Sequence, residues 1–128
     1  MKNSVNERVR MDYDYDYQND SLFLYVNEDY EYKKSLRLDE DLILDFDKDN
    51  VPVALEILHA SKRFRTDRSK LKNPIALKMD IEIGEKSIQI KADFKIIIRN
   101  KDTSLILNAE GENSINVPSI ATQFSAVA

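Results

Sequence analysis

The chain has 128 residues, a net charge of −4, 33% charged residues and no cysteine. Its 37 Leu, Ile, Val and Phe side chains, about 29% of the sequence, are enough for the core of one domain. The lack of cysteine excludes disulfides, thiolate metal sites and a cysteine nucleophile. The opening is polar and the apolar runs are far too short for a membrane helix, so we expect a cytoplasmic protein without signal peptide or membrane anchor.

The first half predicts an antiparallel β-meander over residues 11–60, after a flexible tail at residues 1–10. In the opening "DYDYDY", a two-residue period places the three tyrosines on one face of a strand and the aspartates on the other. Polar turns separate the short apolar runs that follow. The five predicted strands cover residues 12–17, 22–26, 34–38, 42–46 and 53–58.

A short basic helix or linker is predicted over residues 61–74. Ala60, Phe64 and Leu71 recur at helical spacing among the bases. Asn73-Pro74 ends the segment, because a residue that precedes proline is disfavoured in helical conformation.

Residues 75–128 predict a second antiparallel sheet packed on the first, so that the chain forms a single compact unit. Alternate positions are apolar from residue 75 to 83 and again from residue 88 to 96. At the C-terminus, apolar residues recur at helical spacing behind Pro118, which predicts a short terminal helix; they are Val117, Ile120, Phe124 and Val127. The expected fold class is therefore mainly β (α+β).

The sequence carries little catalytic chemistry. It has a single histidine, His59, and only two glycines, so neither a histidine zinc cluster nor a glycine-rich phosphate loop can form. His59 continues the apolar face of the preceding strand, which favours a partly buried structural histidine over a catalytic base. The many carboxylates lie in turns or on polar strand faces, where no desolvated pair stands out. We therefore expect no enzyme activity and no cofactor.

The stretch "DFDKDNVPVALE" has the carboxylate spacing of an EF-hand calcium loop. The four weak candidate ligands are Asp45, Asp47, Asp49 and Glu56. Strand-like flanks would carry Glu56 away from the turn by about 3.3 Å per residue. We therefore favour an acidic hairpin turn without bound metal, and keep calcium binding as the alternative.

The basic segment 62–72 offers a second alternative, contact with nucleic acid. Its weak candidates are Lys62, Arg63, Arg65 and Arg68. The protein as a whole is acidic, which favours a solvated helix face or an internal clasp for the acidic first half. Residues 1–50 carry a charge of −7 and residues 51–74 a charge of +4.

The segments "YDYDYQNDSLFLYV" and "DLILDFDKDNVPVALEILHASKRF" resemble a small prokaryotic family, domain-of-unknown-function family 2283. The resemblance covers residues 11 to about 64. The chain departs from the family pattern at Asn50 and Ala54, where the family often has glycine. The resemblance implies a small protein without assigned activity or catalytic residues, with an antitoxin-like or partner-binding role.

The most consistent function is a non-catalytic, regulatory or protein-interaction module. Antiparallel sheets leave edge strands that can accept another chain's strand. The regular segments "LFLYV" and "ALKMDIEI" are the predicted edges. We expect a homodimer, or a heterodimer with a small basic protein, rather than a free monomer.

Overall fold

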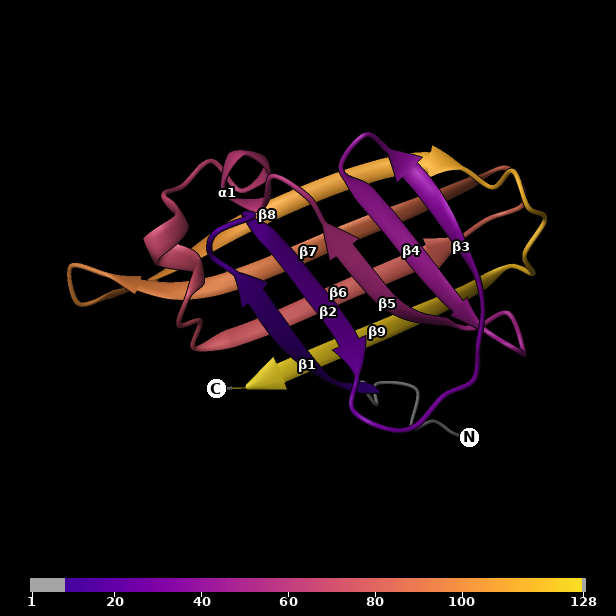
Figure 1. The fold of residues 1–128 in the computed structure, drawn as a ribbon, viewed down its shortest axis with the longest axis horizontal. Coiled ribbons are helices and arrows are strands. Elements are labelled where there is room, and N and C mark those ends of the chain that lie inside the picture. Colours follow the sequence, from indigo (N-terminus) through magenta and orange to yellow (C-terminus); the bar gives the residue numbers. More distant parts are fainter. Residues whose placement is uncertain (1–8, 128) are drawn as a thin grey trace.

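The computed structural model describes residues 9–127 and consists mainly of β-strands (Figure 1). This confirms the mainly β fold class. Within the described residues the elements are β1 (Val9–Asp16), β2 (Ser21–Val26), β3 (Tyr32–Asp39), β4 (Leu42–Asp47), β5 (Pro52–Ile57), α1 (Ala60–Arg63), the 3-10 helix η1 (Arg68–Leu71), β6 (Ala76–Ile83), β7 (Ser87–Ile98), β8 (Lys101–Glu112) and β9 (Ile120–Val127).

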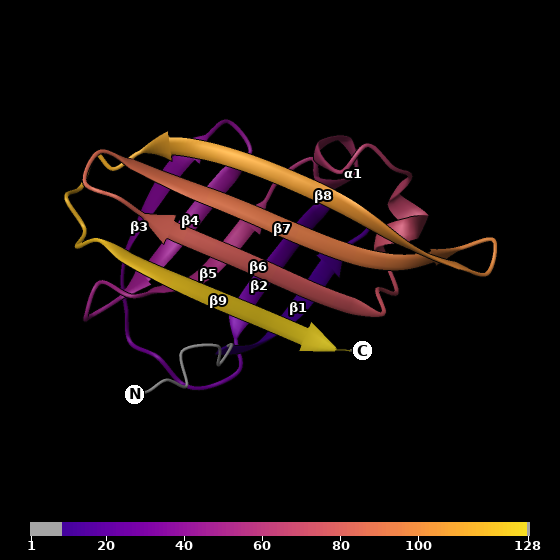
Figure 2. The same ribbon diagram turned by 180° about the vertical axis from the view of Figure 1, so that it is seen from behind.

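The strands form one continuous sheet that folds into two layers. The strand order is β3-β4-β5-β2-β1-β9-β6-β7-β8. Figures 1 and 2 show β1–β5 as one layer and β6–β9 as the other, with the strands of the two layers crossing at an angle. Neighbours pair antiparallel, except that β1 and β9 run parallel where Val9 pairs with Phe124 and Arg10 with Ser125. This short ladder joins the two layers.

The alternation seen in the sequence decides which side chains enter the core. On β6 and β7 every second residue is buried, from Leu77 to Ile83 and from Ile88 to Ile96, as predicted. On β1, Tyr13 and Tyr15 pack against the core, whereas Asp12 and Asp14 lie opposite Tyr25 and Phe23 of β2 on the outer face. The third predicted tyrosine of this face, Tyr17, lies in the turn after β1 and is 46% exposed. One apolar core therefore lies between the two layers.

The two ends of the sheet order approach each other at one point. A Cβ placed on Gly111 of β8 would lie 2.8 Å from Cδ2 of Leu38 and 3.0 Å from its backbone oxygen. Only glycine allows this close approach of β8 to β3. The folded sheet is thus nearly closed at this corner.

In the segment that connects β5 to β6, the helices are shorter than predicted. The helix α1 spans four residues, and Arg65 adopts a left-handed φ of 57° that prevents its continuation. The predicted apolar stripe is nevertheless confirmed, since Ala60, Phe64 and Leu71 are all buried. The ring of Phe64 lies 5.5 Å from that of Phe94, which fixes the segment to β7.

The prediction of a C-terminal helix is wrong, because residues 120–127 form β9. This strand pairs with β6 along eight residue pairs, from Ile83↔Ile120 to Ala76↔Val127. Ile120 and Phe124 pair with the core-facing Ile83 and Met79, so their four-residue spacing fits one face of a strand as well as one face of a helix. Pairing with the open side of β6 outweighs the local helical pattern.

Two further details differ from the expected organisation of the first half. It is not a sequential meander, because β5 pairs with both β2 and β4, and β3 lies at the outer end. Residues 9 and 10 of the predicted tail belong to β1. The remainder of that tail, residues 1–8, lies outside the described residues.

Among residues 9–127, no helix combines the length and the apolar character that crossing a membrane requires.

Candidate functional site

Three of the four carboxylates of the calcium-like spacing accept hydrogen bonds from different parts of the protein. Asp45 accepts a 2.6 Å hydrogen bond from Ser35 Oγ. Asp47 Oδ1 accepts the backbone N–H groups of Asp49 at 2.8 Å and Val51 at 3.0 Å, which shapes the turn. Glu56 instead accepts from Ser21 on the neighbouring strand β2. No group of three or more residues suited to a metal ion occurs within the described part of the chain.

The candidates for nucleic-acid contact divide into those held by the protein and those left exposed. Arg63 NH1 donates to both carboxylate oxygens of Asp39, at 3.0 and 3.1 Å. Arg68 NH1 donates to the carbonyl oxygens of Tyr17 and Gln18. Both arginines therefore tie the basic segment to the acidic first half, which is the geometry of an internal clasp. Lys62 and Arg65 are exposed.

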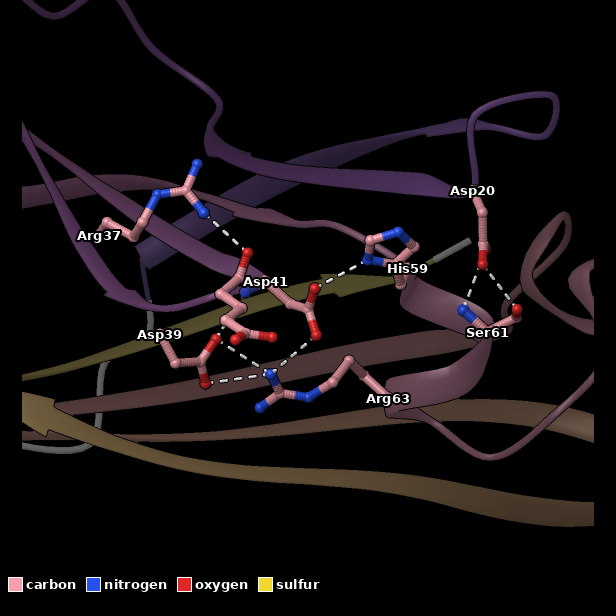
Figure 3. Close-up of polar contacts among 8 residues, drawn as sticks. Asp20, Arg37, Asp39, Asp41, His59, Ser61 and Arg63 are labelled. Carbon is pink, nitrogen blue, oxygen red and sulfur yellow. Dashed lines mark hydrogen bonds and ion pairs between the residues drawn. The ribbon is translucent and has the colours of Figure 1, made fainter.

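A buried carboxylate that the sequence reasoning missed joins the β1–β2 turn to α1 (Figure 3). Asp20 is 3% exposed and accepts hydrogen bonds from Tyr15 OH at 2.6 Å, Ser61 N at 3.0 Å and Ser61 Oγ at 2.7 Å. Burial disfavours its charged form, but the hydrogen bonds from Tyr15 and Ser61 outweigh this, and the pKa of Asp20 is lowered. The only signal in the sequence is the turn "NDS". The role of Asp20 is structural, because protein groups satisfy it.

A second polar cluster lies beside α1 and surrounds the single histidine (Figure 3). His59 Nδ1 lies 2.8 Å from Asp41 Oδ1, and Arg63 bridges Asp39 and Asp41. The hydrogen bond with His59 lowers the pKa of Asp41. The expectation of a partly buried histidine is wrong: its side chain is 62% exposed and its φ of 52° turns the backbone out of the β5 direction. Ser61 directs its hydroxyl to Asp20 instead.

The strands expected to be free edges lie inside the sheet. β2 is flanked by β1 and β5, and β6 by β7 and β9, so neither offers a free edge along its length. These two predictions are wrong because strand partners come from distant parts of the sequence. The strands at the two ends of the order are β3 and β8.

The edge strand β8 has the features of an interaction surface. It runs for 12 residues and pairs with β7 without any register shift. Its residues 103–109 include no charged side chain and no proline, and Ile106 on its outer face is 42% exposed. β8 approaches β3 at the corner near Gly111. Its outer backbone groups therefore form a template for a further strand.

Fold and surface together define a small, two-layered β protein with one long open edge. The chain belongs to the family described as "Protein of unknown function (DUF2283)", which matches residues 12–61. The resemblance deduced from the tyrosine-aspartate opening and the acidic hairpin is thereby confirmed.

Two relatives extend the similarity beyond this segment. A protein of Methanosarcina mazei named putative hypoxanthine phosphoribosyltransferase is 40% identical over 102 residues, which cover 80% of this chain and 80% of the relative. An uncharacterized protein of Methanocaldococcus jannaschii is 34% identical over 111 residues, which cover 86% of this chain and 92% of the relative. No solved structure matches the chain significantly.

Proposed function

We propose that this protein is a non-catalytic interaction module that associates through the free edge of β8, and that its partner is a second copy of the chain. The observation that carries the proposal is the 12-residue edge with its uncharged central stretch. An edge of this length and regularity is a hazard for aggregation unless something covers it. An antitoxin-like role would place a different protein's strand on the same edge.

The opposite edge of the sheet shows how this fold protects an edge that stays free. β3 has register shifts between Tyr32 and Lys34 and again between Arg37 and Asp39. Lys33 and Arg37 are exposed on it. Bulges and basic side chains are the usual means of preventing edge pairing. β8 has no bulge and no basic side chain along residues 103–109. This difference between the two edges supports pairing at β8.

A two-fold axis through Ile106 gives a specific arrangement for two paired β8 strands. Two directly paired residues face the same side of the sheet. Because side chains alternate along a strand, the two residue numbers of each pair of β8 residues are therefore both even or both odd. Pairing centred on Ile106 brings the two exposed isoleucines together and places Leu105 opposite Leu107 on the core side. Asp102 then faces Glu110, and salt would screen this repulsion rather than weaken the dimer.

Cysteine crosslinking tests this arrangement directly, because the natural chain has no cysteine. Ile106→Cys should form a disulfide-linked dimer under mild oxidation. Ser104→Cys and Asn108→Cys should each stay uncrosslinked, since like positions would lie four residues, or about 13 Å, apart along the strands. A mixture of these two variants should crosslink, because residue 104 lies opposite residue 108. Equal crosslinking of all three single variants would contradict the arrangement.

Light scattering with a matched pair of substitutions tests the association itself. Ile106→Lys should yield a monomer at concentrations at which the natural chain is a dimer. Ile97→Lys is the control, because Ile97 is also exposed, at 53%, but lies on the interior strand β7. The dimer should persist in high salt. A strictly monomeric natural chain at high concentration would refute the proposal.

The name of the Methanosarcina mazei relative suggests a second candidate, transfer of a phosphoribosyl group to hypoxanthine. A phosphorylated substrate is usually held by a glycine-rich loop or a helix N-terminus. The α-helix of the described residues has four residues and contains no glycine, so the geometry favours the interaction module. Incubation with hypoxanthine and a phosphoribosyl donor tests the candidate, and formation of a nucleotide would establish it in place of our non-catalytic proposal.

A further inference from the structure

A cavity of about 490 Å³ opens at the end of the molecule where β1 and β9 join the two layers. Segment 28–31, which follows β2, and the β4–β5 turn form its rim, and core-facing residues of β2, β5 and β9 form its floor. Its volume falls in the range of small-molecule sites, about 300–1,000 Å³, and the mouth of a barrel-like sheet is a frequent place for them. The cavity lies apart from the β8 edge, since β8 contributes no lining residue.

The floor is apolar apart from one hydroxyl group. Val26, Val53 and Phe124 are buried core residues that reach the cavity. Thr122 pairs with Ile81 and so faces the core side of β9. Its Oγ1 is shielded from solvent and has no hydrogen-bond partner among the residues that the structure describes. An unsatisfied oxygen of this kind costs stability, and because it is shielded, a ligand in the cavity does not reach it.

The rim is strongly acidic. Among the residues that the structure describes, it carries five carboxylates and a single base, Lys48, whose ammonium lies 4.0 Å from Glu31. Asp47 accepts hydrogen bonds from backbone N–H groups of the β4–β5 turn. Glu28, Asp29 and Asp49 add negative charge at the mouth. This potential repels anions and attracts cations.

We propose that this cavity binds a linear aliphatic polyamine. The methylene chain would lie on the floor formed by Val26, Val53 and Phe124, where it is removed from water. Ammonium groups spaced along the chain would lie at the rim, one of them beside Glu28 and Asp29. A ligand of this class matches the apolar floor and the acidic rim at once.

Calorimetry with spermidine as the probe tests the proposal at low salt. Saturable binding with localised amide shifts at Val26, Val53 and Thr122 is expected. Octanoate should not bind, and octylamine, which has one ammonium group for the several rim carboxylates, should bind more weakly. The absence of saturable spermidine binding up to about 10 mM, well beyond the millimolar end of functional affinities, would overturn the proposal. Octylamine binding as tightly as spermidine would also overturn it.

Substitutions separate specific binding from general attraction of a cation. Glu28→Gln/Asp29→Asn should weaken spermidine binding by at least about fivefold, because two of the rim charges are lost. Asp67→Asn/Asp102→Asn makes the same change in charge at residues that do not line the cavity, and should leave affinity almost unchanged. Equal weakening in the two double variants would show non-specific attraction and refute the site.

Thr122→Val tests the buried hydroxyl. Valine keeps the shape of threonine but has no hydrogen-bonding oxygen, and spermidine binding should stay nearly unchanged, because a ligand in the cavity does not reach the shielded Oγ1. The melting temperature should stay the same or rise, since an unsatisfied buried oxygen is removed. A loss of affinity comparable to that of Glu28→Gln/Asp29→Asn in a folded Thr122→Val protein would contradict this placement of the ligand.

Discussion

Replacing Asp20 with alanine should be among the most damaging single changes in this protein. The substitution leaves Tyr15 OH, Ser61 N and Ser61 Oγ without the buried carboxylate that accepts all three hydrogen bonds. Hydrogen bonds to a charged group contribute about 1.5–3 kcal/mol each and are not additive, so we expect a loss of about 4 kcal/mol. The left-handed φ of 53° at this position adds about 1 kcal/mol for alanine.

Chemical denaturation followed by circular dichroism measures this loss. For a domain whose whole stability is about 5–15 kcal/mol, a loss of this size should also lower the melting temperature by more than about 10 °C. Asp16→Ala is the matched control, because Asp16 caps the same turn through Asn19 but is exposed. It should cost less than about 1 kcal/mol. Similar losses in the two variants would refute the assignment of Asp20 as the buried link between the β1–β2 turn and α1.

The hydrogen bonds that link Asp20 to Tyr15 and Ser61 predict losses of stability at both ends of the pH scale. The pKa of Asp20 is lower in the folded state, so its contribution is present above the ordinary value of 3.8 and is lost as pH falls through the folded value. Burial and the bond to Asp20 raise the pKa of Tyr15, so this contribution is present below 10.0 and is lost as pH rises beyond it. Tyr15→Phe should flatten the alkaline decline in the free energy of unfolding, and an unchanged decline would contradict this cause.

Three further substitutions or additions test other parts of the structure. Ile81→Asp should cost more than about 4 kcal/mol, because it buries an unpaired charge at a 2% exposed position; Glu82→Lys, on the exposed face, should be nearly neutral in the same denaturation assay. Gly111→Ala should cost about 1–3 kcal/mol because its Cβ would lie 2.8–3.0 Å from atoms of β3, whereas Gly84→Ala meets nothing closer than 3.5 Å and should cost less. Calcium at about 1 mM, the weak end of protein calcium sites, should leave the amide shifts of residues 45–56 unmoved, and saturable shifts there would instead establish a calcium site.

The strands were predictable because two-residue alternation is a local property. From Leu77 to Ile83 each apolar residue is buried and each residue between them is more exposed, as the sequence alone indicates. The acidic hairpin was predictable for a similar reason, since Asn50 tolerates the left-handed φ of 62° that it adopts there.

The arrangement of the strands was not predictable, because pairing joins distant segments. Leu24 pairs with Leu55, and this pairing places β2 inside the sheet rather than at its edge. The C-terminal segment has apolar residues at helical spacing, and only the open side of β6 decides that it becomes β9. Sheet formation depends on such contacts more than on local propensity.

The buried polar groups were beyond sequence reasoning for the same reason. Asp20 bonds Ser61 across 41 positions of the chain, so nothing near Asp20 identifies its partner. The cavity likewise gathers segment 28–31, the β4–β5 turn and Thr122, which are far apart in the sequence. Single-residue patterns show that these groups are polar, but not that they are brought together.

The exposure of β8 itself links the fold to the proposed association. Leu105 and Ala109 face the core, yet they are only partly buried, whereas their partners on β7, Phe94 and Ile90, are 0% and 2% exposed. β7 has a strand on each side and β8 has one; on β8, Leu107 is buried at 2% exposed, but its core-facing neighbours Leu105 and Ala109 are not. A second copy paired along β8 would cover Leu105 and Ala109 at the edge of the core. It would also supply hydrogen-bond partners for the outward-facing backbone N–H and C=O groups of β8. The proposed pairing would therefore both extend the sheet and bury more of its last strand.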